Sequence, residues 1–165
     1  VLAWGRIDVT ERSDGVWVHD DARGHDDATL RRPVVVGPDS EIAPGAVVGP
    51  DAALGHNVTV GANATVERTV LDADTRVDAG CTLVDTVTGQ DVDLGAGCVV
   101  PGGRTDVRVG NEIFEEQRLG AVLADRVTAD GDVSVEPGTL VGPSAHLHTG
   151  AHVRGRVPDS AEVMR

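Results

Sequence analysis

The sequence predicts an all-β protein built as a parallel β-helix of hexapeptide repeats, with about six coils and one loop insertion. A branched aliphatic residue, often followed by Gly, recurs every six residues, and a small residue stands four places after it. Gly-Pro and Pro-Gly pairs fall between the aliphatic residues, where a coil must turn a corner. Six residues suit one short strand and a tight turn. Each coil then buries its apolar residues only by stacking on its neighbours.

Two blocks of the chain keep this period without interruption. The aliphatic positions are Val36, Ile42, Val48, Leu54, Val60 and Val66, and later Leu123, Ala129, Val135, Val141, Leu147 and Val153. The small positions are Ser40, Ala46, Ala52, Val58, Ala64 and Val70, and later Val127, Val133, Thr139, Ala145, Ala151 and Val157. We expect both sets to point into the coil.

Between the blocks the repeat continues with two shorter steps of five residues, from Val66 to Leu71 and from Leu83 to Thr88. The two steps lie seventeen residues apart, which is about one coil. Three hexads per coil therefore explain why the same corner is shortened twice. The small positions in this part of the chain are expected at Thr75, Cys81, Val87, Val92 and Cys98.

Cys81 and Cys98 both occupy the small inward position, seventeen residues apart. We expect them to stack on each other at the strand spacing of about 4.8 Å. A disulfide is sterically conceivable at such a distance. In an intracellular chain, two free thiols in the core are the favoured prediction.

Two segments depart from the repeat. Residues Pro101 to Arg118 contain Gly102 and Gly103, many charges and the only Phe of the chain, Phe114. They are expected to form a loop that leaves the stack of coils, and long loops of this kind often carry function. Before Leu30 the sequence becomes polar and rich in Asp. Residues 1–29 therefore read as a linker or an imperfect capping coil, and residues 30–165 as the β-helix domain.

The composition is strongly acidic. The chain has 27 acidic residues, 14 Arg, no Lys and a net charge of −13. Such a surface repels nucleic acid and anionic membranes, so neither is expected as a partner. The sequence shows no membrane span of about eighteen apolar residues and no signal peptide, and we expect a cytoplasmic protein. Acidic excess without Lys indicates adaptation to a high-salt cytoplasm, although an acidic protein of a mesophile remains the alternative.

Three segments resemble a known family, the C-terminal domain of the archaeal GlmU-like proteins. They are Asp91-Val92-Asp93-Leu94-Gly95-Ala96-Gly97, Arg118-Leu119-Gly120-Ala121, and Glu136-Pro137-Gly138 before Val141-Gly142. The likeness covers Leu30 to Arg165. These proteins are bifunctional sugar-1-phosphate nucleotidyltransferases and glucosamine-1-phosphate acetyltransferases. The resemblance implies a left-handed coil, a homotrimer and an upstream nucleotidyltransferase domain. The opening Val1-Leu2-Ala3 … Arg6 is similar to the segment where that domain ends, and the abrupt start fits a fragment without it.

The resemblance also implies where acetyl transfer would occur, and the polar groups it requires are replaced. Acetyl transfer needs a His as general base and cations to hold the sugar phosphate. The positions of the family's His, Tyr and two Asn are held here by Ala79, Thr82, Asp93 and Gly102, and those of its phosphate-binding Arg and Lys by Gly49 and Glu67. Catalytic residues are therefore unknown, and one phosphate ligand has its charge reversed.

The family binds acetyl-CoA mostly through backbone amides and small residues between coils, at positions that correspond to Ala96, Gly131 and Thr149. These three residues are the expected cofactor contacts if the domain is active, with acetyl-CoA as the cofactor; otherwise no cofactor is expected. A groove between stacked coils can also exist without binding any ligand.

The histidines offer two other readings. His56 follows Leu54-Gly55 on a turn and is expected to be a solvated surface residue. His146, His148 and His152 gather near the end of the chain, and Asp130 precedes His148 by eighteen residues. Such residues can bind a metal when neighbouring coils bring them together. The expectation within one chain is a surface cluster without metal, although contacts in a trimer could recruit it.

Two functions remain open. The first is a β-helix without catalytic activity that trimerises and stabilises an upstream sugar-1-phosphate nucleotidyltransferase. The second is an active acetyl-CoA-dependent sugar-phosphate N-acetyltransferase with a rearranged site, which would draw on His56 or on the loop Pro101–Arg118 of a neighbouring subunit. The feature that separates them is a His within reach of a groove that ends near Ala96. The missing catalytic residues favour the first function.

Overall fold

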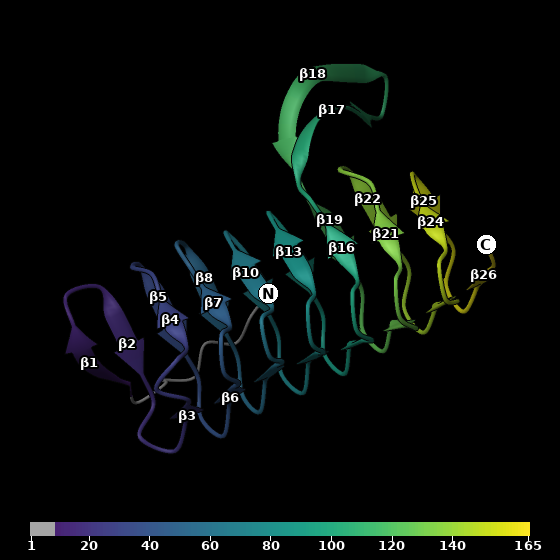
Figure 1. The fold of residues 1–165 in the computed structure, drawn as a ribbon. Coiled ribbons are helices and arrows are strands. Elements are labelled where there is room, and N and C mark those ends of the chain that lie inside the picture. The colour runs from purple at the N-terminus through teal and green to yellow at the C-terminus, as the bar shows by residue number, and fades with distance from the viewer. Residues whose placement is uncertain (1–8) are drawn as a thin grey trace.

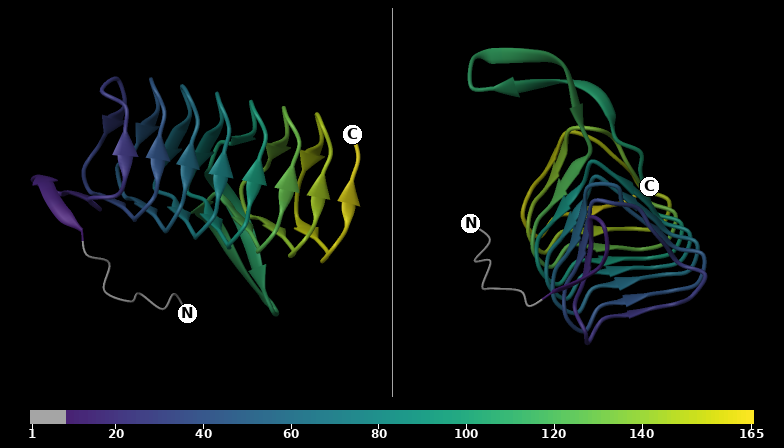
Figure 2. Two further views of the ribbon diagram at one scale, coloured as in Figure 1. Left: turned by 90° about the horizontal axis from the view of Figure 1, so that it is seen from below. Right: turned by 90° about the vertical axis from the view of Figure 1, so that its left-hand side faces the viewer.

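The computed structural model describes residues 9–165, without the side chains of Arg108 and Val109. These residues form stacked coils, and nearly every coil contributes one short strand to each of three sheets (Figure 1). Viewed along its axis the stack is triangular (Figure 2). The segment from Val1 to Arg6, which resembles the end of a nucleotidyltransferase domain, lies outside the described residues.

The three sheets are named here in the order in which a coil visits them. Sheet 1 contains β1 (Thr10–Ser13), β2 (Val16–Val18), β5 (Val34–Val36), β8 (Ala52–Leu54), β11 (Val70–Leu71), β14 (Val87–Thr88), β19 (Ala121–Leu123), β22 (Thr139–Val141) and β25 (Arg156–Val157). Sheet 2 contains β3 (Arg23–Gly24), β6 (Glu41–Ile42), β9 (Thr59–Val60), β12 (Arg76–Val77), β15 (Asp93–Leu94), β20 (Thr128–Ala129), β23 (His146–Leu147) and β26 (Glu162–Val163). Sheet 3 contains β4 (Thr29–Leu30), β7 (Val47–Val48), β10 (Thr65–Glu67), β13 (Thr82–Val84), β16 (Val99–Val100), β21 (Ser134–Val135) and β24 (His152–Val153). In residues 9–165 no helix is long and apolar enough to cross a membrane.

The stack has about eight turns, not the six or so that the hexads predict. An additional first coil is formed by β2, β3 and β4, within residues that the sequence reads as a linker or an imperfect capping coil. The period is weak there because few residues of this coil are buried: Val16, Val18 and Ala22. Both Arg23 and Thr29, in β3 and β4, are exposed.

The aliphatic positions of the repeat form the core, and the small positions lie beside them. Two small positions were predicted wrongly. Val70 is only partly buried and Val87 is 44% exposed, whereas Thr69 and Thr86 are fully buried. Side chains alternate along a strand, so the inward partner of Leu71 or Thr88 stands two residues before it. The five-residue step shortens the turn and moves the inward position from Val70 to Thr69 and from Val87 to Thr86.

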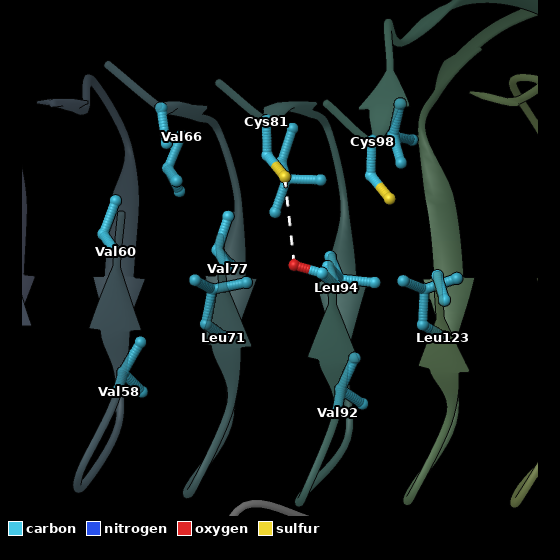
Figure 3. Close-up of a cluster of buried hydrophobic side chains, with 14 of the residues drawn as sticks. Val58, Val60, Val66, Leu71, Val77, Cys81, Val92, Leu94, Cys98 and Leu123 are labelled. Carbon is cyan, nitrogen blue, oxygen red and sulfur yellow. Dashed lines mark hydrogen bonds between the residues drawn. The ribbon is translucent and has the colours of Figure 1, made fainter. Parts of the chain in front are cut away.

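Cys81 and Cys98 are buried and free, as predicted (Figure 3). They lie one coil apart, since Thr82 pairs with Val99 in sheet 3. The Sγ atom of Cys81 donates to the carbonyl of Gly95 over 3.2 Å, and that of Cys98 to the carbonyl of Asp130 over 3.1 Å. A hydrogen bond with Cys81, together with burial, raises the pKa of the Cys98 thiol.

The corners explain part of the Asp content. Most corners contain one residue with positive φ, and among the described residues other than Gly these include six Asp and two Asn: Asp39, Asp51, Asp74, Asp85, Asp91, Asp132, Asn57 and Asn63. Asp and Asn tolerate this left-handed backbone conformation better than other residues with a side chain. The geometry of the coil therefore favours Asp and Asn at these positions independently of any adaptation to salt.

The predicted loop Pro101–Arg118 is a β-hairpin that projects from the stack (Figures 1 and 2). Its strands β17 (Gly103–Val109) and β18 (Glu112–Leu119) pair antiparallel between β16 and β19. Phe114 is 44% exposed and Ile113 is 65% exposed. The hairpin leaves the corner between sheets 3 and 1, which is the corner that the two five-residue steps shorten.

Candidate functional site

The positions that the resemblance assigns to acetyl transfer and acetyl-CoA fall in one column along the corner between sheets 2 and 3. The amide of Gly97 donates to Ala79 over 3.0 Å, and that of Asp132 donates to Ala96 over 2.9 Å. The amide of Gly150 donates to Gly131 over 3.2 Å. The chain thus places Ala79, Ala96 and Gly131, with Thr149 next to Gly150, in four successive coils.

The column has no base at the position that the family uses. Ala79 is exposed, and its backbone amide donates a hydrogen bond to Asp78 Oδ1 over 2.7 Å. Beside it lies a hollow of about 320 Å³ on sheet 2, lined by Thr59, Gly61, Arg76, Val77, Asp78 and Asp93. Two carboxylates and one guanidinium surround this space, and His is absent from the residues that line it. Asp93 therefore lies near Ala79, but the hollow offers no imidazole to act as the base.

The two phosphate-ligand positions lie elsewhere in the same chain. Gly49 and Glu67 belong to the corner between sheets 3 and 1, where Glu67 pairs with Arg68. Gly49 has φ of +99°, and a Cβ there would lie 1.9 Å from the carbonyl oxygen of Arg31, so the backbone leaves no room for the family's Arg. Within one chain, the base position and the phosphate positions are therefore on different corners.

Two cations that the hexapeptide pattern does not reveal lie at that corner. Arg31 and Arg32 line a hollow of about 780 Å³ together with Ser13, Asp14, Val16, Leu30, Pro50 and Glu67. Arg32 pairs with Asp14 across it. Arg31 and Arg32 directly follow β4, the last strand of the first coil, where the hexapeptide pattern gives no signal for them.

The other positions named from the sequence, Thr82, Gly102 and His56, do not form a catalytic arrangement. Thr82 is partly buried in β13, and Gly102, with φ of +63°, lies at the base of the hairpin against Asp85. His56 sits on the corner between sheets 1 and 2, where its Nε2 lies 3.1 Å from Asp39 Oδ2. Its side chain is 55% exposed.

The histidines near the C-terminal end separate into two groups. Nε2 of His146 lies 2.9 Å from Oδ1 of Asp130, and Nδ1 of His148 lies 3.5 Å from Oδ2 of the same carboxylate. The two imidazole rings are 4.1 Å apart. His152 points away on sheet 3, where its Nε2 lies 2.7 Å from Glu136.

The cluster of Asp130, His146 and His148 adjoins the column of the candidate cofactor site, because Asp130 precedes Gly131 and His148 precedes Thr149. The hydrogen bond with His146 holds the pKa of the Asp130 carboxyl below its usual value. The eighteen-residue spacing between Asp130 and His148 is visible in the sequence. That His146 joins them while His152 does not follows only from the assembled coil.

The fold defines a class of protein, the left-handed β-helices built from hexapeptide repeats. Within that class, the profile of the GMPPB C-terminal domain family matches residues 30–157, and the chain belongs to this family. No curated protein matches the sequence.

Solved structures share the fold at low sequence identity. A hexapeptide transferase family protein from Anaplasma phagocytophilum is 16% identical, with a TM-score of 0.66 over 87% of this chain and 78% of that one. The UDP-N-acetylglucosamine acyltransferase of Francisella novicida is 15% identical, with a TM-score of 0.52 over 88% of this chain and 62% of that one. Several further matching structures are also longer, and the chain spans 50% to 64% of their length.

Proposed function

We propose that this chain is the C-terminal β-helix domain of a sugar-1-phosphate nucleotidyltransferase, that it serves trimerisation, and that it has lost acetyl transfer. Membership of the GMPPB C-terminal domain family supports a role in sugar-nucleotide biosynthesis. The nucleotidyltransferase activity would belong to an upstream domain. The observation that carries the assembly role is the outer face of sheet 1.

Sheet 1 turns a nearly continuous apolar row outward. The row runs through Trp17, Val35, Ala53, Val70, Val87, Val122 and Leu140, which pair with one another from coil to coil. Val87, Val122 and Leu140 are 44%, 45% and 50% exposed. A sheet with one solvated face normally alternates apolar residues inside with polar residues outside. This row breaks that rule in a chain of net charge −13.

Sheet 2 carries no such row. The outward residues of sheet 2 include Arg23, Glu41, Arg76, Asp93 and Glu162, and they are polar or charged throughout. A contiguous exposed apolar patch of this kind marks an interaction surface. Three copies that turn sheet 1 towards a common axis cover the row and close the assembly, as identical subunits require.

Loss of acetyl transfer is supported by the contents of the column. Ala79 supplies no base, Glu67 places a carboxylate at a phosphate position, and the backbone at Gly49 excludes an Arg. Family members that transfer acetyl groups need the base and the cations together. Restoring one residue, as in Ala79→His, is therefore not expected to create activity.

One observation favours the alternative of an active acetyl-CoA-dependent transferase with a rearranged site. Asp130 and His146 form a carboxylate–imidazole pair next to Gly131, one coil beyond Ala96. Such a pair can serve as a general base. A transferase of this kind would use His146, not His56, which lies on another corner with Asp39.

Light scattering tests the assembly. The particle in solution should have about three times the mass of one 17.1 kDa chain. Val122→Asp places a charge in the apolar row and should give monomers, whereas Thr128→Asp, in sheet 2 of the same coil, should leave the trimer intact. A monomeric wild-type chain, or equal effects of the two substitutions, would overturn the role.

A coupled thiol-release assay with acetyl-CoA and glucosamine-1-phosphate separates the two functions. We expect no turnover within a hundredfold of an ordinary enzyme rate of about 10 s⁻¹. Turnover that disappears in His146→Ala and survives in His56→Ala would establish the alternative instead.

A further inference from the structure

Three side chains from two adjacent coils present their ligand atoms to one point near the C-terminal end of the stack. The ligand atoms of Asp130, His146 and His148 all lie within 4.8 Å of one another. Asp130 and His148 hold the same corner position in successive coils, and the amide of Asp130 donates to Leu147, between the two histidines, over 2.9 Å. The backbone ladder therefore fixes the spacing of the three residues.

The separations suit a small divalent metal ion. A tetrahedral ion with bonds of about 2.0 to 2.1 Å places its ligand atoms about 3.3 Å apart. Nε2 of His146 lies 2.9 Å from Oδ1 of Asp130, and Nδ1 of His148 lies 3.5 Å from Oδ2, so both separations are close to that value. The side chains of Asp130, His146 and His148 are 36%, 38% and 30% exposed, so an ion can enter without a rearrangement of the core.

A fourth residue completes the arrangement from the next coil. Nε2 of His148 is buried and makes no hydrogen bond, and it lies 3.7 Å from Oε2 of Glu162 in β26. A histidine that binds metal through one nitrogen usually donates its other N–H to a carboxylate or carbonyl, which fixes the tautomer. Glu162 is placed to accept that hydrogen bond while Nδ1 of His148 faces the ion.

We propose that Asp130, His146 and His148 form a binding site for zinc or a similar divalent metal ion, oriented by Glu162. Two imidazoles and one carboxylate are a ligand set that zinc accepts, and three protein ligands leave a position open for water. The ion replaces the hydrogen bond between Nε2 of His146 and Asp130, and the neutral imidazole then carries its single proton on Nδ1. The site goes beyond the assembly role, and its test is independent of trimerisation.

Two other pairs in the chain provide matched controls. His56 pairs with Asp39, and His152 pairs with Glu136, each with one imidazole and one carboxylate. Neither belongs to a group of three possible ligands among the described residues. Binding that depends on simple His–carboxylate pairs would occur at all three places. Binding at the proposed site depends on the second histidine.

Isothermal titration calorimetry of the 165-residue chain with zinc chloride tests the site. We expect one ion per chain with a Kd below about 10 μM. Replacement of an orienting partner commonly weakens binding about 10- to 100-fold. Glu162→Gln should fall in that range, and His146→Gln and His148→Gln should each exceed it. His152→Gln and His56→Gln should leave the Kd unchanged, and circular dichroism should show that all the variants are folded.

A spectroscopic readout identifies the ligands. Cobalt(II) bound at the site should give visible absorption bands that His148→Gln abolishes and His152→Gln preserves. The proposal is overturned if the wild-type chain binds no zinc, if His148→Gln binds as the wild type does, or if His152→Gln loses binding to the same extent.

Discussion

Nε of Arg118 lies 3.0 Å from Oδ2 of Asp85, and this hydrogen bond ties the end of the projecting hairpin to the coil below it. Oδ1 of the same carboxylate accepts a hydrogen bond from Nε of Arg68 over 2.6 Å. The side chain of Asp85 is only 13% exposed, whereas that of Arg118 is 64% exposed. Asp85 is therefore the shared acceptor that holds two guanidinium groups at the base of the hairpin.

Asp85→Asn should lower the free energy of unfolding by about 1 to 3 kcal/mol at pH 7, because the two guanidinium groups lose a charged acceptor. Asn keeps the left-handed backbone at φ of 55°. Asp91→Asn is the matched control, since Asp91 also has φ of 55° but is exposed. Urea unfolding should show a change below about 0.5 kcal/mol for the control.

The effect of Asp85→Asn should depend on pH in a defined direction. Burial of Asp85 tends to raise its pKa, but the hydrogen bonds from Arg68 and Arg118 outweigh it, and the pKa is lowered. A lowered pKa stabilises the folded state above the unfolded value of about 3.9. This contribution is lost as the pH falls from there through the folded pKa. Unfolding free energies of the wild type and Asp85→Asn should therefore converge below about pH 4; a constant difference down to acid pH would contradict this.

Phe114→Ala should weaken the proposed trimer more than any single Val→Ala on an outward face. Phe114 is held out on β18 of the hairpin, 44% exposed, and a buried aromatic anchor can contribute about 2 kcal/mol or more at an interface. Sedimentation equilibrium of Phe114→Ala and of Val99→Ala, which lies on the outer face of sheet 3, provides the comparison. Equal dissociation constants for the two variants would show that the hairpin anchors nothing.

Salt should stabilise the folded chain. Asp74 and Asp91 hold the same corner position in successive coils, at a strand spacing of about 4.8 Å, and the chain carries a net charge of −13. The Debye length falls from about 10 Å at 0.1 M to about 3 Å at 1 M, so repulsion between such carboxylates is screened. Thermal melts should shift upward over this range. Flat or falling melting temperatures would argue against the predicted adaptation to high salt.

The two thiols should be inert in the folded state. Cys81 and Cys98 are 0% and 2% exposed, and the raised pKa of Cys98 lowers its thiolate fraction at neutral pH. Ellman's reagent should react more than about 100-fold more slowly with native than with urea-unfolded chain. Rapid labelling of the native chain would show that the coils open near these residues.

The sequence predicted the β-helix well because one residue pattern repeats in coil after coil and fixes which side chains turn inward. At the two five-residue steps the pattern was misleading. The hexads assigned Val70 and Val87 to the core, whereas the alternation of side chains along the strands places Thr69 and Thr86 there. The hexapeptide pattern did not predict the first coil, because the strands of this coil bury few aliphatic side chains. It also gave no reason to expect the hollow that Arg31 and Arg32 line.

The candidate sites show a different limit. Spacing alone could place Asp130 and His148 at equivalent corners, since both follow the repeat. Whether His146 or His152 joins them depends on which sheet each strand enters, because the outward faces of β23 and β24 point in different directions. That distinction becomes visible only when the coil is assembled in three dimensions.

The hairpin β1–β2 covers the N-terminal edge of sheet 1. A parallel solenoid presents open strand edges at its ends, and such edges can recruit further chains end to end. At sheet 1, β1 runs antiparallel to β2, and its residues Thr10, Glu11, Arg12 and Ser13 are all exposed and polar. An incoming coil would meet a strand of the wrong direction there, edged with charge. Deletion of residues 1–13 should therefore free this edge and allow chains to associate end to end along the axis of the stack.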